Sequence, residues 1–148
     1  MLLALIPLSL SLPQASVDIS SLPVRAPAPL APLATDWLLD EVARRAEVYR
    51  DEQGQTIVLD NGLLRRSIRM TPNAATVRLD DLMTGRSLLR AVQPEAMVTL
   101  DGVPHAIGGL TGQPNLAYLD PEWLAAMEAA PGAWRVTGFD VGVPSERL

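Results

Sequence analysis

The chain has 148 residues, a formal net charge of −5, one histidine and no cysteine, and 48% of its residues are hydrophobic and 20% charged. This composition predicts a folded soluble body and excludes a disordered chain or a polytopic membrane protein. All 12 basic residues are arginine, and an acidic chain without arginine runs among aromatic residues is not expected to bind nucleic acid. The lack of cysteine, with His105 as the single histidine, excludes disulfides, thiolate sites and a multi-histidine zinc site, so we expect no metal and no cofactor.

An apolar stretch, residues 2–12, begins the chain. It has the length of a signal-peptide core and is far shorter than the roughly 20 residues of a membrane span. We therefore predict a signal peptide over residues 1–15, no stable membrane span, and a secreted, periplasmic or extracellular location. The positively charged segment that normally begins a signal peptide is missing, since the first arginine is Arg25. The alternative, a buried N-terminal strand or helix, is interrupted by Pro7 and Pro13.

Residues 16–35 are predicted to form a proline-rich leader or linker. Residues 23–32 contain four prolines, which favour an extended polyproline II conformation, and we expect this leader to join no core. A β-rich N-terminal domain is then expected over residues 36–148. It opens with a helix of about ten residues capped by Asp36. The apolar side of that helix carries Trp37, Leu38, Val42 and Ala46.

From Tyr49 the hydrophobic period changes from helical to two, which is typical of strands with one buried face. Residues 55–60 (QTIVLD) and 63–70 (LLRRSIRM) flank Asn61-Gly62, a dipeptide typical of a tight hairpin turn. A strand with one solvent-exposed face is predicted over residues 75–79. Residues 95–100 and 103–107 flank Asp101-Gly102 and repeat the hairpin pattern, with Pro104 placing the second strand at a sheet edge. Together these strands predict a meander.

Residues 108–115 (GGLTGQPN) are predicted to be a surface loop because they are rich in glycine and proline. A helix is predicted over residues 121–130, capped by Asp120, and a last strand over residues 133–139. The expected fold is mainly β, an antiparallel β-sandwich or meander with one or two short helices. So few strands leave edges unpaired, so the sequence predicts an incomplete domain, truncated at its C-terminal end.

Several turn motifs between Tyr49 and Leu148 resemble those of a known protein family. They are Asn61-Gly62-Leu63, residues 71–77 (TPNAATV), residues 82–85 (LMTG) and residues 108–115. The region resembles the N-terminal β-sandwich, or supersandwich, of large secreted bacterial glycoside hydrolases of the α-galactosidase kind. The resemblance implies that the catalytic carboxylates lie in a downstream domain of the same polypeptide and that no catalytic residue belongs to this chain.

Polar residues with potential chemistry are few in the β region. Asp80-Asp81 is an adjacent acidic pair there, and strand neighbours point to opposite faces, so we interpret the pair as a solvated turn. No motif ties an acid or a nucleophile to His105, which favours a structural or exposed histidine. Alternation places Arg66 on the apolar face of its strand, where an ion pair with an acid is the preferred interpretation and a ligand contact the alternative.

Three residues at or near the glycine-rich loop complete the candidate set for carbohydrate binding or an interdomain surface. Tyr118 and Trp123 carry rings that stack on sugars, and Asn115 ends the loop. A core position for Trp123 is the preferred interpretation.

The leading functional hypothesis is a non-catalytic segment of a secreted carbohydrate-active enzyme that supports or covers the downstream catalytic domain. The alternative is a stand-alone exported module that binds polysaccharide or mediates adhesion. A small hydrolase built around His105 is the weakest of the three.

Overall fold

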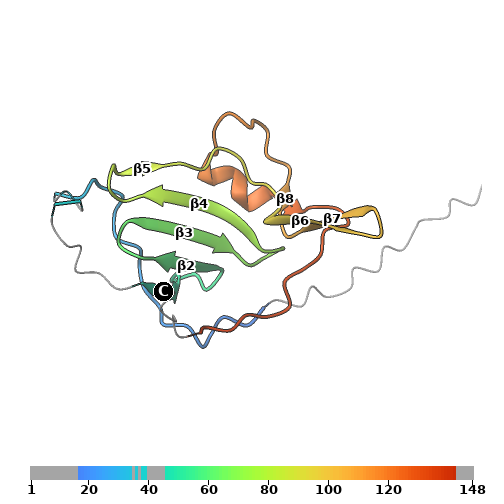
Figure 1. Ribbon diagram of the computed structural model, residues 1–148, viewed down its shortest axis with the longest axis horizontal. Coiled ribbons are helices and arrows are strands. Elements are labelled where there is room, and N and C mark those ends of the chain that lie inside the picture. The colour runs from blue at the N-terminus through green and yellow to red at the C-terminus, as the bar shows by residue number, and fades with distance from the viewer. Residues whose placement is uncertain (1–16, 35, 37, 40–45, 143–148) are drawn as a thin grey trace, which may run out of the picture.

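The computed structural model describes residues 17–34, 36, 38–39 and 46–142. Its largest element is a five-stranded antiparallel sheet whose strands follow one another in chain order (Figure 1). The strands are β1 (Glu47–Arg50), β2 (Thr56–Asp60), β3 (Leu64–Arg69), β4 (Ala75–Asp81) and β5 (Arg86–Ser87). The predicted mainly antiparallel β class is confirmed, and β1 to β5 form a meander. β1 and β5 are strands that the sequence pattern does not predict.

The hairpin of β2 and β3 is closed by Asn61 and Gly62, as predicted. Gly62 has a φ angle of +84°, which glycine adopts without a steric penalty. The Asn61 side chain accepts hydrogen bonds from the backbone N–H groups of Leu63 (3.0 Å) and Leu64 (2.8 Å). The turn is therefore held by a local side chain as well as by the strand pairing.

A β-bulge interrupts the pairing of β3 with β4. Ser67 lies opposite Arg78 and Ile68 lies opposite Thr76, so Val77 has no partner on β3. A bulge of this kind bends the strand and redirects a side chain. Val77 and Arg78, although consecutive, accordingly line the same groove on one face of the sheet.

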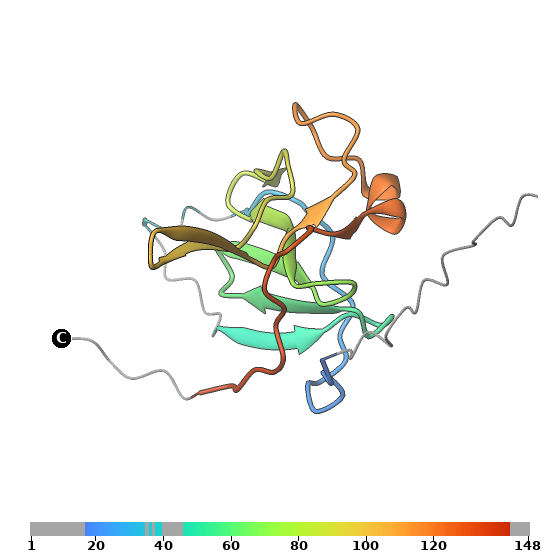
Figure 2. The ribbon, with the colours of Figure 1, turned by 90° about the vertical axis from the view of Figure 1, so that its right-hand side faces the viewer.

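The second predicted hairpin is present as β6 (Ala96–Leu100) and β7 (Val103–Ile107), with Asp101 and Gly102 at positive φ angles in the turn. It forms a two-stranded sheet of its own and projects beside the main sheet (Figures 1 and 2). The prediction that it continues the meander is therefore wrong. Pro104 is tolerated because both strands of a two-stranded sheet are edges.

The helix predicted over residues 121–130 is shorter than expected. It is a 3-10 helix, η1 (Pro121–Ala126), in which Asp120 accepts the predicted capping hydrogen bond from the Glu122 N–H (3.0 Å). η1 ends because Met127 turns into an apolar cluster, where it is 4% exposed. The chain then continues as β9 (Glu128–Ala129).

Two neighbouring predictions also change. β9 pairs with β8 (Leu110–Thr111), so the predicted surface loop 108–115 contains a strand, and Leu110 is buried. The strand predicted over residues 133–139 is reduced to one bridge between Trp134 and Ile107. Both errors arise because long-range contacts decide the structure of segments whose local signals are weak.

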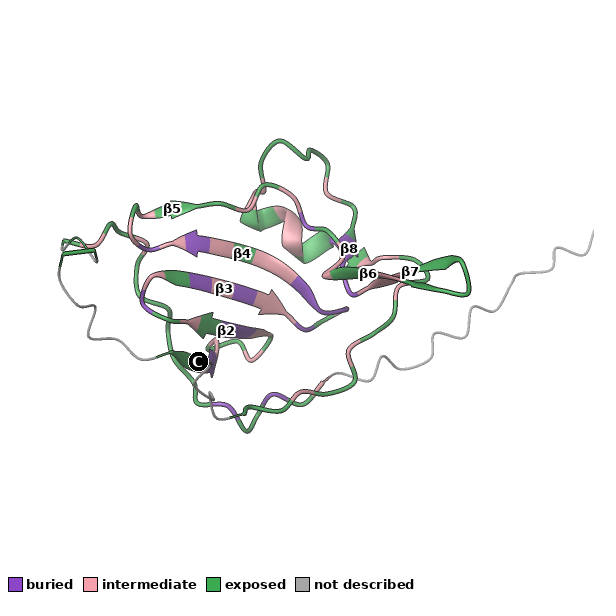
Figure 3. Ribbon diagram, in the orientation of Figure 1, coloured by how far each residue is buried: buried purple, intermediate pink, exposed green. Residues whose placement is uncertain are grey.

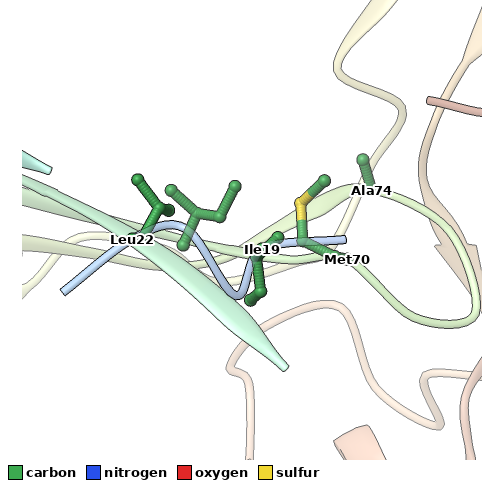
Figure 4. Packing of buried hydrophobic residues seen from close by; sticks show 5 residues of the cluster. Ile19, Leu22, Met70 and Ala74 are labelled. Atoms are coloured by element: carbon green, nitrogen blue, oxygen red, sulfur yellow. The ribbon is translucent and has the colours of Figure 1, made fainter. Parts of the chain in front are cut away.

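The first hydrophobic cluster joins the N-terminal residues to the sheet (Figure 4). Ile19 and Leu22 are 5% and 7% exposed and pack with Ile57, Met70 and Ala74. The partly buried Val136 and Phe139 pack against the same cluster. The prediction that residues 16–35 join no core is therefore wrong, since their few large apolar side chains cover one face of the sheet.

Residues 23–33, here called the strap, then cross to the other face of the sheet. The N–H of Arg50 donates to the carbonyl of Pro23 (2.9 Å), and the N–H of Leu33 donates to the carbonyl of Leu82 (3.2 Å). Between these points Arg65 donates to the carbonyl of Ala28 (2.6 Å). The strap is a proline-rich segment that belongs to no regular strand or helix, and it is fastened to the sheet.

The second cluster fixes the position of η1. Ala75, Val92, Leu110 and Met127 are buried in it, and Val77, Leu119 and Leu124 pack against them. Buried residues lie on β2, β3 and β4, whereas the β6–β7 hairpin is largely exposed (Figure 3).

The predicted signal peptide, residues 1–15, and most of the helix predicted after Asp36 lie outside the described residues. Within the part that is described, no helix is long and apolar enough to cross a membrane.

Candidate functional site

Strand register divides the side chains of the sheet between two faces. The strap face carries Tyr49, Val58, Ser67 and Arg78 in one cross-strand row and Asp60, Arg65 and Asp80 in the next. The opposite face carries Ile57 and Ile68 under the first cluster. Its less covered part, here called the open face, carries Leu59, Leu64, Arg66 and Leu79, with Val48 at the border of the cluster. The candidate residues are distributed over both faces and the loop before η1.

Gln113 organises this loop, although the sequence gives it no special signal beyond its place after a glycine. Its side-chain oxygen accepts from the Val92 N–H (3.0 Å), and its amide nitrogen donates to the carbonyls of Arg90 (2.9 Å), Asn115 (2.6 Å) and Tyr118 (3.0 Å). One side chain therefore ties the loop to the chain before β6. The loop is consequently a fixed platform at the surface.

The rings of Tyr118 and Trp123 meet on this platform. Their centroids are 5.1 Å apart and the rings are tilted by 42°. Tyr118 is 55% exposed and Trp123 is half-buried. Asn115 is exposed and its side chain accepts from the Ala117 N–H (2.8 Å), which shapes the loop beside the rings. Three of the four candidate residues are thus brought together.

Trp123 does not take the core position that the sequence favoured. Its neighbour Leu124 packs into the second cluster instead, and Trp123 packs against Tyr118 at the surface. Because η1 is a 3-10 helix, its side-chain spacing differs from the α-helical spacing on which the prediction relied.

Arg66 lies apart from the aromatic pair, on the open face. The alternation argument is confirmed, and so is the predicted ion pair, because Arg66 pairs with Glu95 and its Nε donates to the Thr76 hydroxyl (2.8 Å). Glu95 also accepts from the Thr76 N–H and hydroxyl. This network fastens the start of the β6–β7 hairpin to the sheet next to the bulge, and it accounts for Arg66 without a ligand.

The Asp80-Asp81 pair is not a solvated turn. Both residues belong to β4, and Asp80 is fully buried beside Arg78, whose Nε lies 2.7 Å from one carboxylate oxygen and donates to the other (2.9 Å). Asp81 accepts hydrogen bonds from the turn that follows, and the hydrogen bond from the Thr84 hydroxyl (2.7 Å) lowers the pKa of Asp81. The prediction that the two carboxylates face apart is consistent with this strand.

His105 packs against Trp134, with ring centroids 5.1 Å apart. Within the described part of the chain, no carboxylate or hydroxyl is hydrogen-bonded to its side chain, and no three potential ligands gather into a metal-binding cluster. The hydrolase hypothesis based on His105 therefore gains no support. Trp134 is 43% exposed, so it caps the histidine and is not a core residue.

A groove that no sequence pattern indicates crosses the strap face. Its cavity volume is about 440 Å³, and it runs over Val58, Ser67 and Arg78 between Pro27 of the strap and Leu124 of η1. The alternating pattern predicts that Ser67 and Arg78 face solvent, and no sequence pattern predicts the bulge that brings Val77 to the groove. The groove was therefore not predictable from the sequence.

Comparisons of the chain with protein families, with curated proteins and with solved structures found no match.

Proposed function

We propose that this chain is a non-catalytic β module of an exported carbohydrate-active protein, and that it holds polysaccharide on the Tyr118–Trp123 pair. The observation that supports the proposal is the platform itself, in which two adjacent rings are presented at the surface by a loop fixed through Gln113. A preformed aromatic surface lowers the entropy lost on binding a flexible chain. The resemblance to glycoside hydrolase N-terminal regions is in accord with this role.

The acidic residues support a non-catalytic role. Hydrolysis of glycosides generally uses two carboxyl groups that flank the scissile bond. In the described chain, Asp60, Asp80 and Glu95 are engaged by arginines, and Asp81 by its own turn. Asp51 is the one carboxylate among the residues that line the strap-face groove.

The aromatic pair is tested by truncation. We expect Tyr118→Ala and Trp123→Ala each to weaken binding to an insoluble polysaccharide about tenfold, since exposed aromatic anchors carry most of the energy of such contacts. Retention in affinity electrophoresis across a panel of neutral polysaccharides measures the effect. Trp134→Ala is the matched control, because Trp134 is also partly exposed but packs on His105, away from the pair. Equal losses for all three variants would contradict the proposal.

A second candidate role is support of a catalytic domain downstream in the same polypeptide. The open face favours it, because Leu59 and Leu64 are 38% and 43% exposed there beside Val48 and Leu79. Contiguous exposed apolar side chains on a sheet are typical of a surface that another domain covers. In this role the Arg66–Glu95 pair borders the interface.

Both roles predict that the isolated chain is inactive. We expect the purified protein to release no nitrophenol from a panel of aryl α- and β-glycosides above the rate of a buffer blank. A preparation in which turnover persists through two chromatographic steps and co-elutes with the chain would rule out the non-catalytic assignment.

A further inference from the structure

The groove on the strap face has the composition of a small-ligand site. Its volume of about 440 Å³ falls within the range of roughly 300 to 1,000 Å³ that small-molecule sites occupy. Its floor combines polar side chains with the buried Val58, and its wall is apolar. The floor carries Thr56, Ser67, Arg78 and Ser87, from four adjacent strands, and the wall carries Val77, Leu89, Leu119 and Leu124.

Ser67 is the most informative residue of the floor. Ser67 is 7% exposed, and its hydroxyl oxygen is not enclosed: in the described part of the chain, the enclosed side-chain atoms without a hydrogen-bond partner are Arg69 Nε and one carboxylate oxygen of Asp80. A hydroxyl that reaches a groove can exchange hydrogen bonds with water or with a ligand. Ser67 lines the groove, so its hydroxyl is available to a ligand there.

Arg78 provides directed donors at the same place. Its Nε is held by the buried Asp80, so its guanidinium has a fixed position while the side chain remains 46% exposed. Within the described residues no hydrogen bond joins its terminal nitrogens to the protein, so they are available to other acceptors. Asp51 lines the groove as well, so the charges of Asp51 and Arg78 balance and the groove fits a neutral polar ligand better than an anion.

Hydrogen bonds from arginines of the sheet hold the two sides of the groove, η1 and the strap, in place. Arg69 donates to the carbonyl of Leu124 and thereby holds η1 over the sheet, while Arg65 holds the strap at Ala28. The bulge at Val77 turns an apolar side chain toward the groove next to Arg78. Bulges of this kind frequently lie beside functional sites because they redirect a side chain.

We propose that this groove binds one neutral pyranose unit. The hydroxyl groups of such a ring would exchange hydrogen bonds with Ser67, Arg78 and the neighbouring floor residues, and its C–H face would lie on Leu119 and Leu124. The choice of a sugar as ligand rests on the proposed function. The groove adjoins the aromatic platform, because Leu119 and Leu124 follow Tyr118 and Trp123 directly in the chain. The platform therefore holds the polymer and the groove takes a single ring.

The test is a titration of the ¹⁵N-labelled full chain with the methyl glycosides of glucose, galactose and mannose, followed by NMR. We expect at least one of them to cause saturable shifts of the Ser67 and Arg78 amides. Ser87→Trp fills the groove from an exposed edge-strand position and should weaken this binding at least tenfold. Leu88→Trp is the matched control, since Leu88 is 51% exposed and does not line the groove. A dispersed spectrum of each variant shows that it is folded.

The outcomes separate the two proposals. Groove shifts that persist in Trp123→Ala, together with loss of polysaccharide retention, support both. Groove shifts without any polysaccharide retention support the groove and contradict the platform. If no methyl glycoside causes saturable shifts at the groove, or if the shifts survive Ser87→Trp, the groove proposal is wrong, even where polysaccharide is retained.

Discussion

Replacing Gly108 with alanine is expected to lower the free energy of unfolding by about 3 kcal/mol or more. Gly108 has a φ angle of +64°, and an added Cβ would lie 2.3 Å from the carbonyl oxygen of Ala74. The left-handed conformation alone costs an L-residue roughly 1–2 kcal/mol. Relief of the clash requires a backbone shift, and that shift strains the hydrogen bonds from Gly108 to Trp134 (2.9 Å) and from Gly109 to Ala74 (2.8 Å).

Gly132→Ala separates the two contributions. Gly132 has a similar φ angle of +70°, but an added Cβ there meets nothing within 4 Å. The free energy of unfolding of Gly132→Ala should therefore fall only by the conformational cost, roughly 1–2 kcal/mol. Urea unfolding followed by tryptophan fluorescence measures both. Equal losses for the two variants would show that the close approach of the Gly108 backbone to Ala74 does not contribute.

The sequence predicts the strands of this chain well where period-two patterns meet specific turn residues. Asn61-Gly62 and Asp101-Gly102 adopt the expected turns, and their flanking strands agree with the predicted bounds within about two residues. The ion pair of Arg66 was also predictable, because alternation alone places a charge on an apolar face that must be neutralised.

Other features depend on contacts that local patterns do not encode. Residues 121–130 have good helical composition, but burial of Met127 and pairing of Ala129 with Leu110 end the helix early. The proline-rich composition of the strap predicts a solvated segment. The fold shows in addition that Ile19 and Leu22, just before the strap, lie in a core cluster. The groove depends on the bulge at Val77, whose position follows from strand register.

Arg65 is the second residue whose replacement should have a large effect. It is 2% exposed, its Nε donates to Asp60 (3.2 Å), and it lies directly opposite the fully buried Asp80 on β4. It also fixes the strap through the Ala28 carbonyl. Removing one member of a buried charged group leaves the others uncompensated, which typically costs about 3–5 kcal/mol. We expect a loss in that range for Arg65→Met, measured by urea unfolding.

Two further variants serve as controls for this prediction. Arg25→Met removes an ion pair with Glu47 whose side chains are 58% and 46% exposed, and it should cost less than about 1 kcal/mol. The double variant Arg65→Met with Asp60→Leu should recover part of the loss, because it removes the unpaired carboxylate together with the cation. If Arg65→Met lowers the free energy of unfolding no more than Arg25→Met does, the row of Asp60, Arg65 and Asp80 does not stabilise the fold. The strap would then owe its position to Ile19, Leu22 and the backbone hydrogen bonds at its two ends.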